Sequence, residues 1–325
     1  MTAHPAQPDD RVADLHVHTT ASDGRWAPAR VVRHLAELGV GAVGIADHDE
    51  VGGIPEAIEA GRACGVEIVP AVELSTAVPE EPRERRGGRT GKIGTGTHFS
   101  TDARHTDHSH AEKWVPVPIF PKEIHILGYH IDREAPELLE VLEACRTHRR
   151  RRMDVMVDNL ADVGVPIDID RVHELAGEGA IGRPHLAQAM VEAGHVRSVE
   201  EAFVRYLSPG RPGYAPKWKM TPAEACALIR RIGGVPVLAH PMLLKDDGLV
   251  AEIIRDGALG LEAYYPYVSV EVTERYVRMA DAAGLLVTGG SDCHQADGNL
   301  VMGRVRLPYA RVEALRARWE ALGAK

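Results

Sequence analysis

The sequence has 17 histidines against 3 phenylalanines, so the placement of histidine is the first guide to its chemistry. Histidine is the commonest metal ligand and a frequent general acid–base. His16 and His18 close an apolar stretch with one residue between them, so on a strand both imidazoles lie on the same face. Such a pair alone fits two packed or surface histidines about as well. A site is predicted only if further donors occupy comparable positions.

Further donors do follow almost every apolar run of the chain. Glu73 ends a nearly wholly apolar stretch, where an unpaired carboxylate would be costly, so we expect a cation near it. His125 lies between two isoleucines, and the alternative for it is a satisfied core histidine. Imidazole and carboxylate donors without thiolate suit zinc, manganese or iron better than a closed structural cysteine site. The polar residues in these positions are His16, His18, Asp47, His48, Glu73, His125, His240, Glu262, Asp292 and His294.

Seven short apolar runs alternate with segments of helical period, which is typical of βαβ units and a parallel sheet. In a parallel α/β barrel the carboxyl ends of the strands converge on one face and carry the active site. The sequence therefore predicts a seven-stranded parallel barrel with the polar residues at its C-terminal face. The predicted strands are residues 12–17, 40–45, 66–72, 123–129, 235–239, 259–263 and 285–288.

Two segments depart from the barrel pattern. Residues 136–218 read as one long helix and three short ones, which we interpret as an inserted helical lid domain between the barrel segments 11–135 and 219–325. Residues 77–121 lack any sustained period and form a loop insertion, whose histidines we interpret as bystanders. Residues 1–10 are predicted to be a disordered lead. The basic run from Arg149 to Arg152 is expected to surround its helix as a solvated face.

Composition excludes several classes of function. The chain has 325 residues, 47 acidic and 38 basic, with a formal net charge of −9, which disfavours a protein that contacts the backbone of duplex nucleic acid. Four cysteines without a Cys-x-x-Cys pair indicate reduced thiols and a cytoplasmic protein. We expect neither a signal peptide nor a membrane span, because no apolar run reaches the roughly 18 to 20 residues that a span requires.

Six segments together resemble the polymerase and histidinol phosphatase (PHP) superfamily of metal-dependent phosphoesterases. They are ADLHVHTTASDG at 13–24, ADHD at 46–49, VEL at 72–74, HILGYHID at 125–132, VLAHP at 237–241 and GSDCH at 290–294. The resemblance implies a distorted (β/α)7 barrel and a cofactor of two to three divalent ions, manganese, iron or zinc. The implied metal ligands are His16, His18, Asp23, His48, Glu73, His125, His240, Asp292 and His294.

The resemblance also suggests a substrate. Asp23, together with the lid, resembles the branch that removes the 3′-phosphate of nucleoside 3′,5′-bisphosphates. In that branch an Arg-x-His motif faces the phosphate, which implies phosphate contacts from Arg183 and His185, although Arg183 could instead simply open a surface helix. Lys217 is a further candidate for substrate binding. Asp47 or His185 is the candidate catalytic group that protonates the leaving oxygen.

Other activities remain open at this point. A related enzyme would be a phosphodiesterase that acts on a cyclic phosphate, or on short oligonucleotides from the 5′ end. A different class would be a PHP module that binds metal but has lost catalysis, which the complete ligand set disfavours. The expected partner is a small phosphorylated substrate, a nucleotide, with no duplex nucleic acid, no membrane and no obligate protein partner.

Overall fold

The computed structural model describes residues 11–78, 123–177, 181–216, 219–295 and 301–323. The predicted disordered lead, nearly all of the 77–121 insertion with its histidines, and Lys217 lie outside the described residues. None of the helices in the described ranges is long and apolar enough to cross a membrane.

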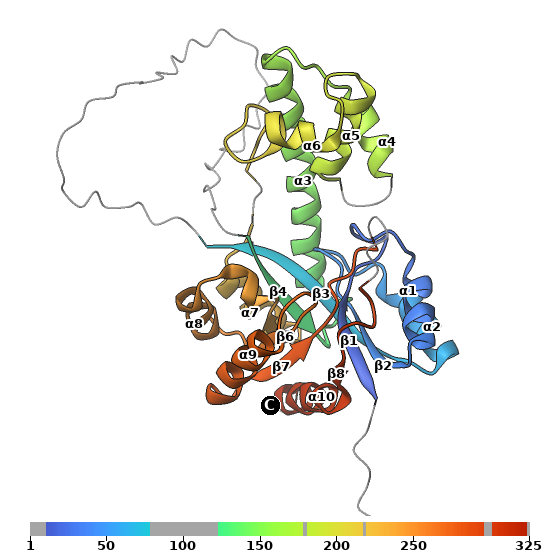
Figure 1. The fold of residues 1–325 in the computed structure, drawn as a ribbon, viewed down its shortest axis with the longest axis vertical. Helices are drawn as coiled ribbons and strands as arrows, with labels where there is room; N and C mark the ends of the chain where they lie inside the picture. The colour runs from blue at the N-terminus through green and yellow to red at the C-terminus, as the bar shows by residue number, and fades with distance from the viewer. Residues whose placement is uncertain (1–10, 79–122, 178–180, 217–218, 296–300, 324–325) are drawn as a thin grey trace, which may run out of the picture.

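The described part of the chain forms one eight-stranded sheet that curls into a nearly closed barrel (Figure 1). The strand order is β7-β6-β5-β4-β3-β2-β1-β8. Closure involves the segment that follows β7, where the Asp292 backbone N–H donates to the His16 carbonyl at 2.7 Å. The strands are β1 (Val12–Val17), β2 (Val40–Ile45), β3 (Glu67–Ala77), β4 (Glu123–Tyr129), β5 (Val235–Leu238), β6 (Gly260–Tyr264), β7 (Leu286–Gly289) and β8 (Leu307–Pro308).

The sheet is parallel except around β4 and at β8. β1, β2 and β3 pair in parallel, as do β5, β6 and β7, whereas β4 runs antiparallel to both β3 and β5. The expectation of seven parallel strands was therefore wrong for β4, and it also missed the two-residue β8, which pairs antiparallel with β1. Apolar runs reveal that a strand exists but not its direction, and the next strand in the chain can pair with its neighbour in either direction.

The reversal of β4 matters for the site. His125 is the third residue of β4 and pairs with Ser75, near the end of β3. It was expected at the C-terminal end of a strand, yet it lies close to the N-terminal end of its own. Because β4 is reversed, its first residues lie at the edge of the barrel where β3 ends. His125 consequently joins the donors that the parallel strands carry.

Helices cover the outside of the barrel (Figure 1). α1 (Pro28–Glu37) and α2 (Ile54–Cys64) pack side by side on β1 to β3, and α7 (Pro222–Arg231), α8 (Asp247–Arg255) and α9 (Val270–Ala282) lie on the other flank. α7 begins as its sequence predicts, with a capping box between Thr221 and Glu224 and a proline in its first turn. α10 (Tyr309–Gly323) covers the opposite end of the barrel from the donors, where Arg316 donates to Glu67 at the start of β3.

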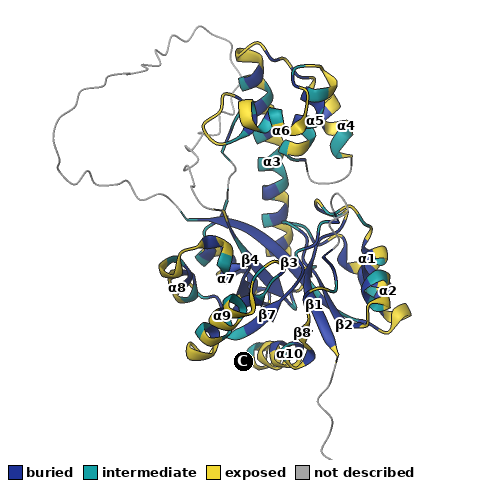
Figure 2. Ribbon diagram, in the orientation of Figure 1, coloured by how far each residue is buried: buried dark blue, intermediate teal, exposed yellow. Residues whose placement is uncertain are grey.

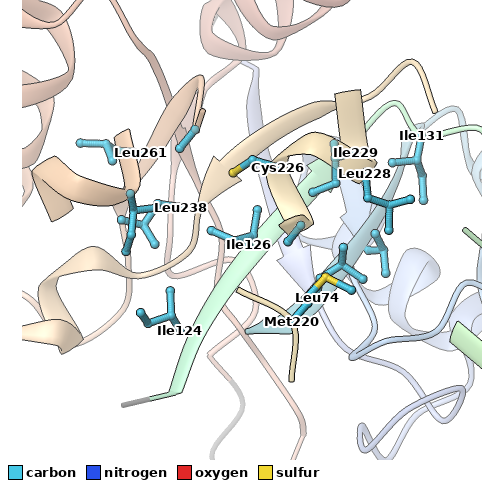
Figure 3. Packing of buried hydrophobic residues seen from close by; sticks show 14 of the residues in the cluster. Leu74, Ile124, Ile126, Ile131, Met220, Cys226, Leu228, Ile229, Leu238 and Leu261 are labelled. Carbon is cyan, nitrogen blue, oxygen red and sulfur yellow. The ribbon is translucent and has the colours of Figure 1, made fainter. Parts of the chain in front are cut away.

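Apolar side chains fill the space between the strands and the helices. Buried residues are concentrated in the strands, whereas the outer faces of the helices are exposed (Figure 2). Leu74, Ile126 and Leu238, from β3, β4 and β5, belong to one cluster with Ile229 of α7 (Figure 3). At roughly 1.5 to 3 kcal/mol for each such side chain, this burial stabilises the strands whose ends carry the polar donors.

The long helix α3 (Pro136–Asp162) leads away from the barrel and supports a group of short helices at its far end (Figure 1). These are α4 (Ile169–Ala176), α5 (Arg183–Glu192), α6 (Val199–Ala202) and the π-helical turn η1 (Phe203–Leu207). Met156 and Leu160 of α3 share a hydrophobic cluster with Leu186 and Met190 of α5, separate from the clusters of the barrel. We call α4, α5, α6, η1 and the part of α3 that packs on them the helical unit.

Candidate metal centre and active site

β1 contributes the first two donors. His16 and His18 are fully buried, and their Nε2 atoms lie 3.2 Å apart. Asp292, which follows β7, places Oδ1 3.0 Å from His18 Nε2 and 3.5 Å from His16 Nε2. The approach requires glycine at position 290, because a Cβ there would come within 2.4 Å of the His16 backbone nitrogen. Backbone packing therefore holds Asp292 against the two imidazoles.

Glu73 lies at the middle of the donors. Its side chain is fully buried, and both of its oxygens face imidazole nitrogens. Oε1 lies 2.8 Å from His125 Nδ1 and 3.2 Å from His240 Nε2. Oε2 lies 2.9 Å from His48 Nδ1, 3.2 Å from His18 Nε2 and 3.3 Å from His16 Nε2. A single carboxylate thus connects histidines that lie in β1 and β4 with histidines that follow β1, β2 and β5.

Asp23 and His294 extend the cluster toward solvent. The Asp23 Oδ1 atom lies 3.3 Å from His294 Nε2 and 3.7 Å from His18 Nδ1, and the rings of His18 and His294 stack with centroids 3.9 Å apart. The structure thus brings all nine sequence-predicted ligands together. Three overlapping groups of donors could each hold a metal ion: His16, His18, Glu73 and Asp292; His18, Asp23, His48 and His294; His48, Glu73 and His125.

The residues of the cluster fit divalent metal ions. Two buried ring nitrogens, His18 Nδ1 and His240 Nδ1, make no hydrogen bond to other described residues, and Glu73 Oε2 and His48 Nδ1 lie 2.9 Å apart without the geometry of a hydrogen bond. Buried polar atoms are normally satisfied, and leaving one without a partner costs about 1 to 3 kcal/mol. Imidazole nitrogens and carboxylate oxygens with no thiolate match manganese, iron and zinc alike. Cys293 is buried beside the cluster but belongs to none of the three donor groups.

Opposite charges within the cluster shift the pKa values of its members. Burial by itself lowers the pKa of histidine, but the carboxylates of Glu73 and Glu123 outweigh burial and raise the pKa of His125 to about 9. Hydrogen bonds to Asp292 and Glu73 likewise raise the pKa of His18 to about 10 against the effect of burial. Burial would raise the pKa of Glu73, yet the charges of His125, His48 and His16 hold it well below its ordinary value. Without metal, the cluster therefore holds protons on these imidazoles opposite ionised carboxylates.

Glu262 and Tyr265, near the end of β6, support the cluster from behind. Glu262 is fully buried, and its Oε1 lies 3.0 Å from His16 Nδ1 while Oε2 accepts the His240 backbone N–H at 2.8 Å. A carboxylate on the outer nitrogen of a ligand histidine fixes its tautomer and its ring orientation. The Tyr265 hydroxyl donates to Asp292 Oδ2 at 2.9 Å, so it orients the other side of that carboxylate.

Asp47 holds the loop between β1 and α1. Its carboxylate is buried and accepts three hydrogen bonds, from the Thr19 backbone N–H at 2.7 Å, the Thr19 hydroxyl at 2.7 Å and the Ser22 hydroxyl at 2.5 Å. This loop carries Asp23. The neighbouring Asp49 pairs with Arg149 of α3, which ties α3 to the residue that follows His48.

α3 and α5 each contribute one arginine that bonds to a backbone carbonyl. Arg183, at the start of α5, donates to the Leu207 carbonyl at 3.3 Å, and Arg152 of α3 donates to the Ala215 carbonyl at 2.7 Å. Both guanidinium groups are half-buried, and in the described part of the chain neither forms an ion pair with a carboxylate. Burial and the nearby charge of Arg183 lower the pKa of Arg152 to about 10. His185 accepts the Gly182 backbone N–H on Nδ1 at 3.2 Å.

Three residues near the site were not assigned a role from the sequence. Arg152 was interpreted as part of a solvated helix face, but it is half-buried, donates to the Ala215 carbonyl and lies near Arg183 of α5. Glu262 was recognised only as a polar residue at a strand end, although the same cost argument that singled out Glu73 applies to it. Nothing in the sequence distinguished Tyr265 from Tyr264.

Comparisons with known proteins agree with this geometry. A family model described as the PHP domain matches residues 14–143. The chain is 28% identical to the 5′-3′ exoribonuclease Rnm of Escherichia coli, over 95% of this chain and 94% of that one. It is 28% identical to the 3′,5′-nucleoside bisphosphate phosphatase of Chromobacterium violaceum, over 86% of both chains. A phosphoribosyl 1,2-cyclic phosphate 1,2-diphosphodiesterase of Eggerthella lenta is 25% identical over 91% of this chain and 99% of that one.

A solved structure shares the whole fold. The crystal structure of a metal-dependent phosphoesterase from Bifidobacterium adolescentis superposes with a TM-score of 0.70 at 27% identity, covering 96% of this chain and 98% of that one. The superposed length includes the helical unit as well as the barrel. The barrel, the donor cluster and these relatives identify the chain as a member of the PHP superfamily of metal-dependent phosphoesterases, hydrolases that act on phosphoric esters.

Proposed function

We propose that the enzyme removes the 3′-phosphate from nucleoside 3′,5′-bisphosphates, using two or three divalent ions held by the nine clustered donors. The observation that carries this proposal is the pair of half-buried guanidinium groups, Arg152 and Arg183, which lie near each other and, among the described residues, form no salt bridge. Two like charges in a half-buried place are unfavourable unless an anion lies between them. A substrate with two phosphates supplies one for the metal cluster and one for the arginines.

Burial lowers the pKa of His185 and the charge of Asp23 offsets this only in part, so the Arg-x-His motif of α5 lies within electrostatic range of the donor cluster. On the other side, Glu123 Oε1 lies 3.6 Å from His125 Nε2, and its charge acts on Arg152. The proposed phosphate site is therefore adjacent to the cluster. Arginine's planar fork suits this task, because it can bind two phosphate oxygens at once.

In this reaction a water oxygen forms a bond to the phosphorus of the 3′-phosphate while the bond from phosphorus to O3′ breaks. When bound, divalent ions supply two kinds of chemistry here, lowering the pKa of water and neutralising the phosphoryl oxygens. Glu73, Asp292 and the surrounding histidines hold their positions through contacts to Glu262, Tyr265 and the backbone, which reduces reorganisation during the reaction.

The hydrogen bonds of the two candidate proton donors favour other roles for them. Asp47 accepts three hydrogen bonds from Thr19 and Ser22, so its carboxylate serves to fix the loop that carries Asp23. His185 accepts a backbone N–H on Nδ1, which leaves the proton of the neutral ring on Nε2. Burial lowers the pKa of His185, which favours this neutral form. We therefore assign His185 as a hydrogen-bond donor to a phosphate oxygen or to O3′.

A second candidate function is removal of nucleotides from the 5′ end of short RNA. It is favoured by the E. coli relative named as a 5′-3′ exoribonuclease, which this chain matches over 94% of its length. The two reactions break the same P–O3′ bond beside a 5′-phosphorylated nucleoside. They differ only in what the 3′-phosphoryl group carries, which is nothing in the bisphosphate and a further nucleoside in RNA.

The test compares adenosine 3′,5′-bisphosphate with adenosine 3′-monophosphate, which lacks the phosphate proposed to bind the arginines. Losing a charge-assisted contact of about 1.5 to 3 kcal/mol should reduce kcat/KM roughly ten- to a hundredfold. Phosphate release should yield adenosine 5′-monophosphate from the bisphosphate, measured with each of manganese, iron and zinc. Equal kcat/KM values for the two substrates would contradict the proposed role of the second phosphate. A ribose 1,2-cyclic phosphate should be assayed as well, because a relative is named as a phosphodiesterase for such a substrate.

A further inference from the structure

A cavity of about 230 Å³ opens beside the donor cluster, at the ends of β6 and β7. Its walls come from the segment that follows β6 and from the segment that precedes β8. They include three tyrosines and two arginines: Tyr264, Tyr265, Tyr267, Arg304 and Arg306. Neither the proposed phosphate contacts nor the metal donors use this cavity.

Tyr265 connects the cavity to the site. It lines the cavity, and its hydroxyl donates to Asp292 Oδ2 at 2.9 Å, while Asp292 Oδ1 lies 3.0 Å from His18 Nε2. The cavity therefore shares a wall residue, Tyr265, with the metal donor Asp292. The cavity lies on the Asp292 side of the cluster. Glu123, whose charge acts on Arg152, lies on the His125 side.

The lining has the chemistry of a nucleotide site. No acidic side chain lines the cavity among the residues that the structure describes, although the whole chain carries a formal charge of −9. Arg304 and Arg306 are exposed and, within the described ranges, neither pairs with a carboxylate. Tyrosine rings offer stacking surfaces to a base of any identity, and arginine binds phosphate.

Tyr267 is unusual for an aromatic residue in two respects. Its side chain is 68% exposed at the cavity rim, and its backbone has a φ of 62°. A bulky residue in the left-handed region costs about 1 kcal/mol or more, and such strain is concentrated at binding sites. Burial of the ring does not offset this cost, so a role in binding accounts for it better than packing does.

We propose that this cavity binds the nucleoside downstream of the scissile phosphate, with its base on Tyr267 and its next phosphate on Arg304 and Arg306. The proposal rests on the second candidate function above, removal of nucleotides from the 5′ end of short RNA, and assigns the residues that would hold the second nucleotide of that substrate. A nucleoside 3′,5′-bisphosphate has nothing beyond its 3′-phosphate, so it leaves the cavity unused. In the dinucleotide, water attacks the same phosphorus and the same P–O3′ bond breaks. O3′ takes up a proton, and both products are nucleoside 5′-monophosphates.

The test uses two substrates, adenosine 3′,5′-bisphosphate and the 5′-phosphorylated dinucleotide pApA, on the metal-loaded full chain. The variants are Tyr267→Ala and the double variant R304A/R306A, with Arg318→Ala on the exposed face of α10 as the matched control. Loss of one stacked base should raise KM for pApA roughly ten- to a hundredfold and leave the bisphosphate unchanged. Equal effects on both substrates, or none on pApA, would overturn the proposal.

A binding measurement separates this proposal from the proposed function. Fluorescence anisotropy gives the Kd of a labelled dinucleotide whose central linkage is a non-hydrolysable methylene phosphonate. The wild type should bind it more tightly than the corresponding mononucleotide, and Tyr267→Ala should remove that difference. If this contrast holds while no 3′-phosphate is hydrolysed, the cavity assignment stands and the proposed reaction falls. If the wild type binds both probes equally, the cavity assignment is wrong whatever the activity.

Discussion

Arg183→Ala should reduce the kcat/KM for adenosine 3′,5′-bisphosphate far more than that for p-nitrophenyl phosphate, which has no second phosphate. Arg183 opens α5, donates to the Leu207 carbonyl at 3.3 Å and lies near Arg152. A charge-assisted contact to phosphate in this half-buried place contributes about 1.5 to 3 kcal/mol, which corresponds to roughly ten- to a hundredfold in rate. Arg152 remains in the variant, so the loss is expected toward the lower end of this range.

Steady-state kinetics with one metal decides the matter. Arg183→Lys should fall between the wild type and the alanine variant, because lysine keeps the charge but not the planar fork. Arg171→Ala is the matched control, since Arg171 lies on α4 of the same helical unit and its charge is already paired with Glu174 and Glu192. If the two substrates lose activity equally in Arg183→Ala, then Arg183 only supports its helix and the second phosphate binds elsewhere.

Three other predictions concern how the metal centre is built. Glu262→Gln should weaken metal binding about ten- to a hundredfold, because the carboxylate that orients His16 is lost. Glu252→Gln, on the exposed face of α8, is the control and should leave metal affinity unchanged. Unchanged affinity in Glu262→Gln would refute the orienting role. Metal binding should release protons and strengthen as the pH rises toward about 9, because Glu73 outweighs burial and raises the pKa of His125 to that value, and only neutral imidazole binds metal. Calorimetry in buffers of different ionisation enthalpy measures this release, and uptake of protons would refute it. Deleting residues 80–112 should leave metal content unchanged by elemental analysis, since none of the nine donors lies there and loop closure depends only weakly on length; a folded deletion variant without metal would show that the insertion helps to build the site.

Local sequence patterns were sufficient to predict most of the fold. The bounds of β1, β2 and β4 agree with the apolar runs from which they were predicted. The apolar residues that mark these strands in the sequence are also buried in the fold, so the local pattern and the tertiary structure favour the same element. The direction of β4 could not be predicted in this way. The direction of β4 depends on the end of the barrel at which the chain re-enters after residues 79–122, and an apolar run does not indicate strand direction.

The residues of the site likewise include some that the sequence predicts and some that it does not. The cost of burying Glu73 could be judged from its apolar neighbours, and motif resemblance supplied the other donors. Arg152 was missed because its neighbours, Arg183 and the Ala215 carbonyl, come from later segments that sequence alone does not place beside its helix. Tyr265 was missed because its function depends on one hydrogen bond to Asp292, 27 residues away in the sequence.

The central claim is that the histidines and carboxylates around Glu73 form a centre for divalent metal ions. Elemental analysis of the purified chain, before and after reconstitution, tests it directly, with Glu73→Gln as the comparison. The three overlapping donor groups lead us to expect about two to three transition-metal ions per chain. Glu73 belongs to two of these groups, so Glu73→Gln should lose metal and turnover while circular dichroism shows an intact barrel. Less than about one ion per chain in the reconstituted wild type, or full metal content in a folded Glu73→Gln variant, would contradict the account.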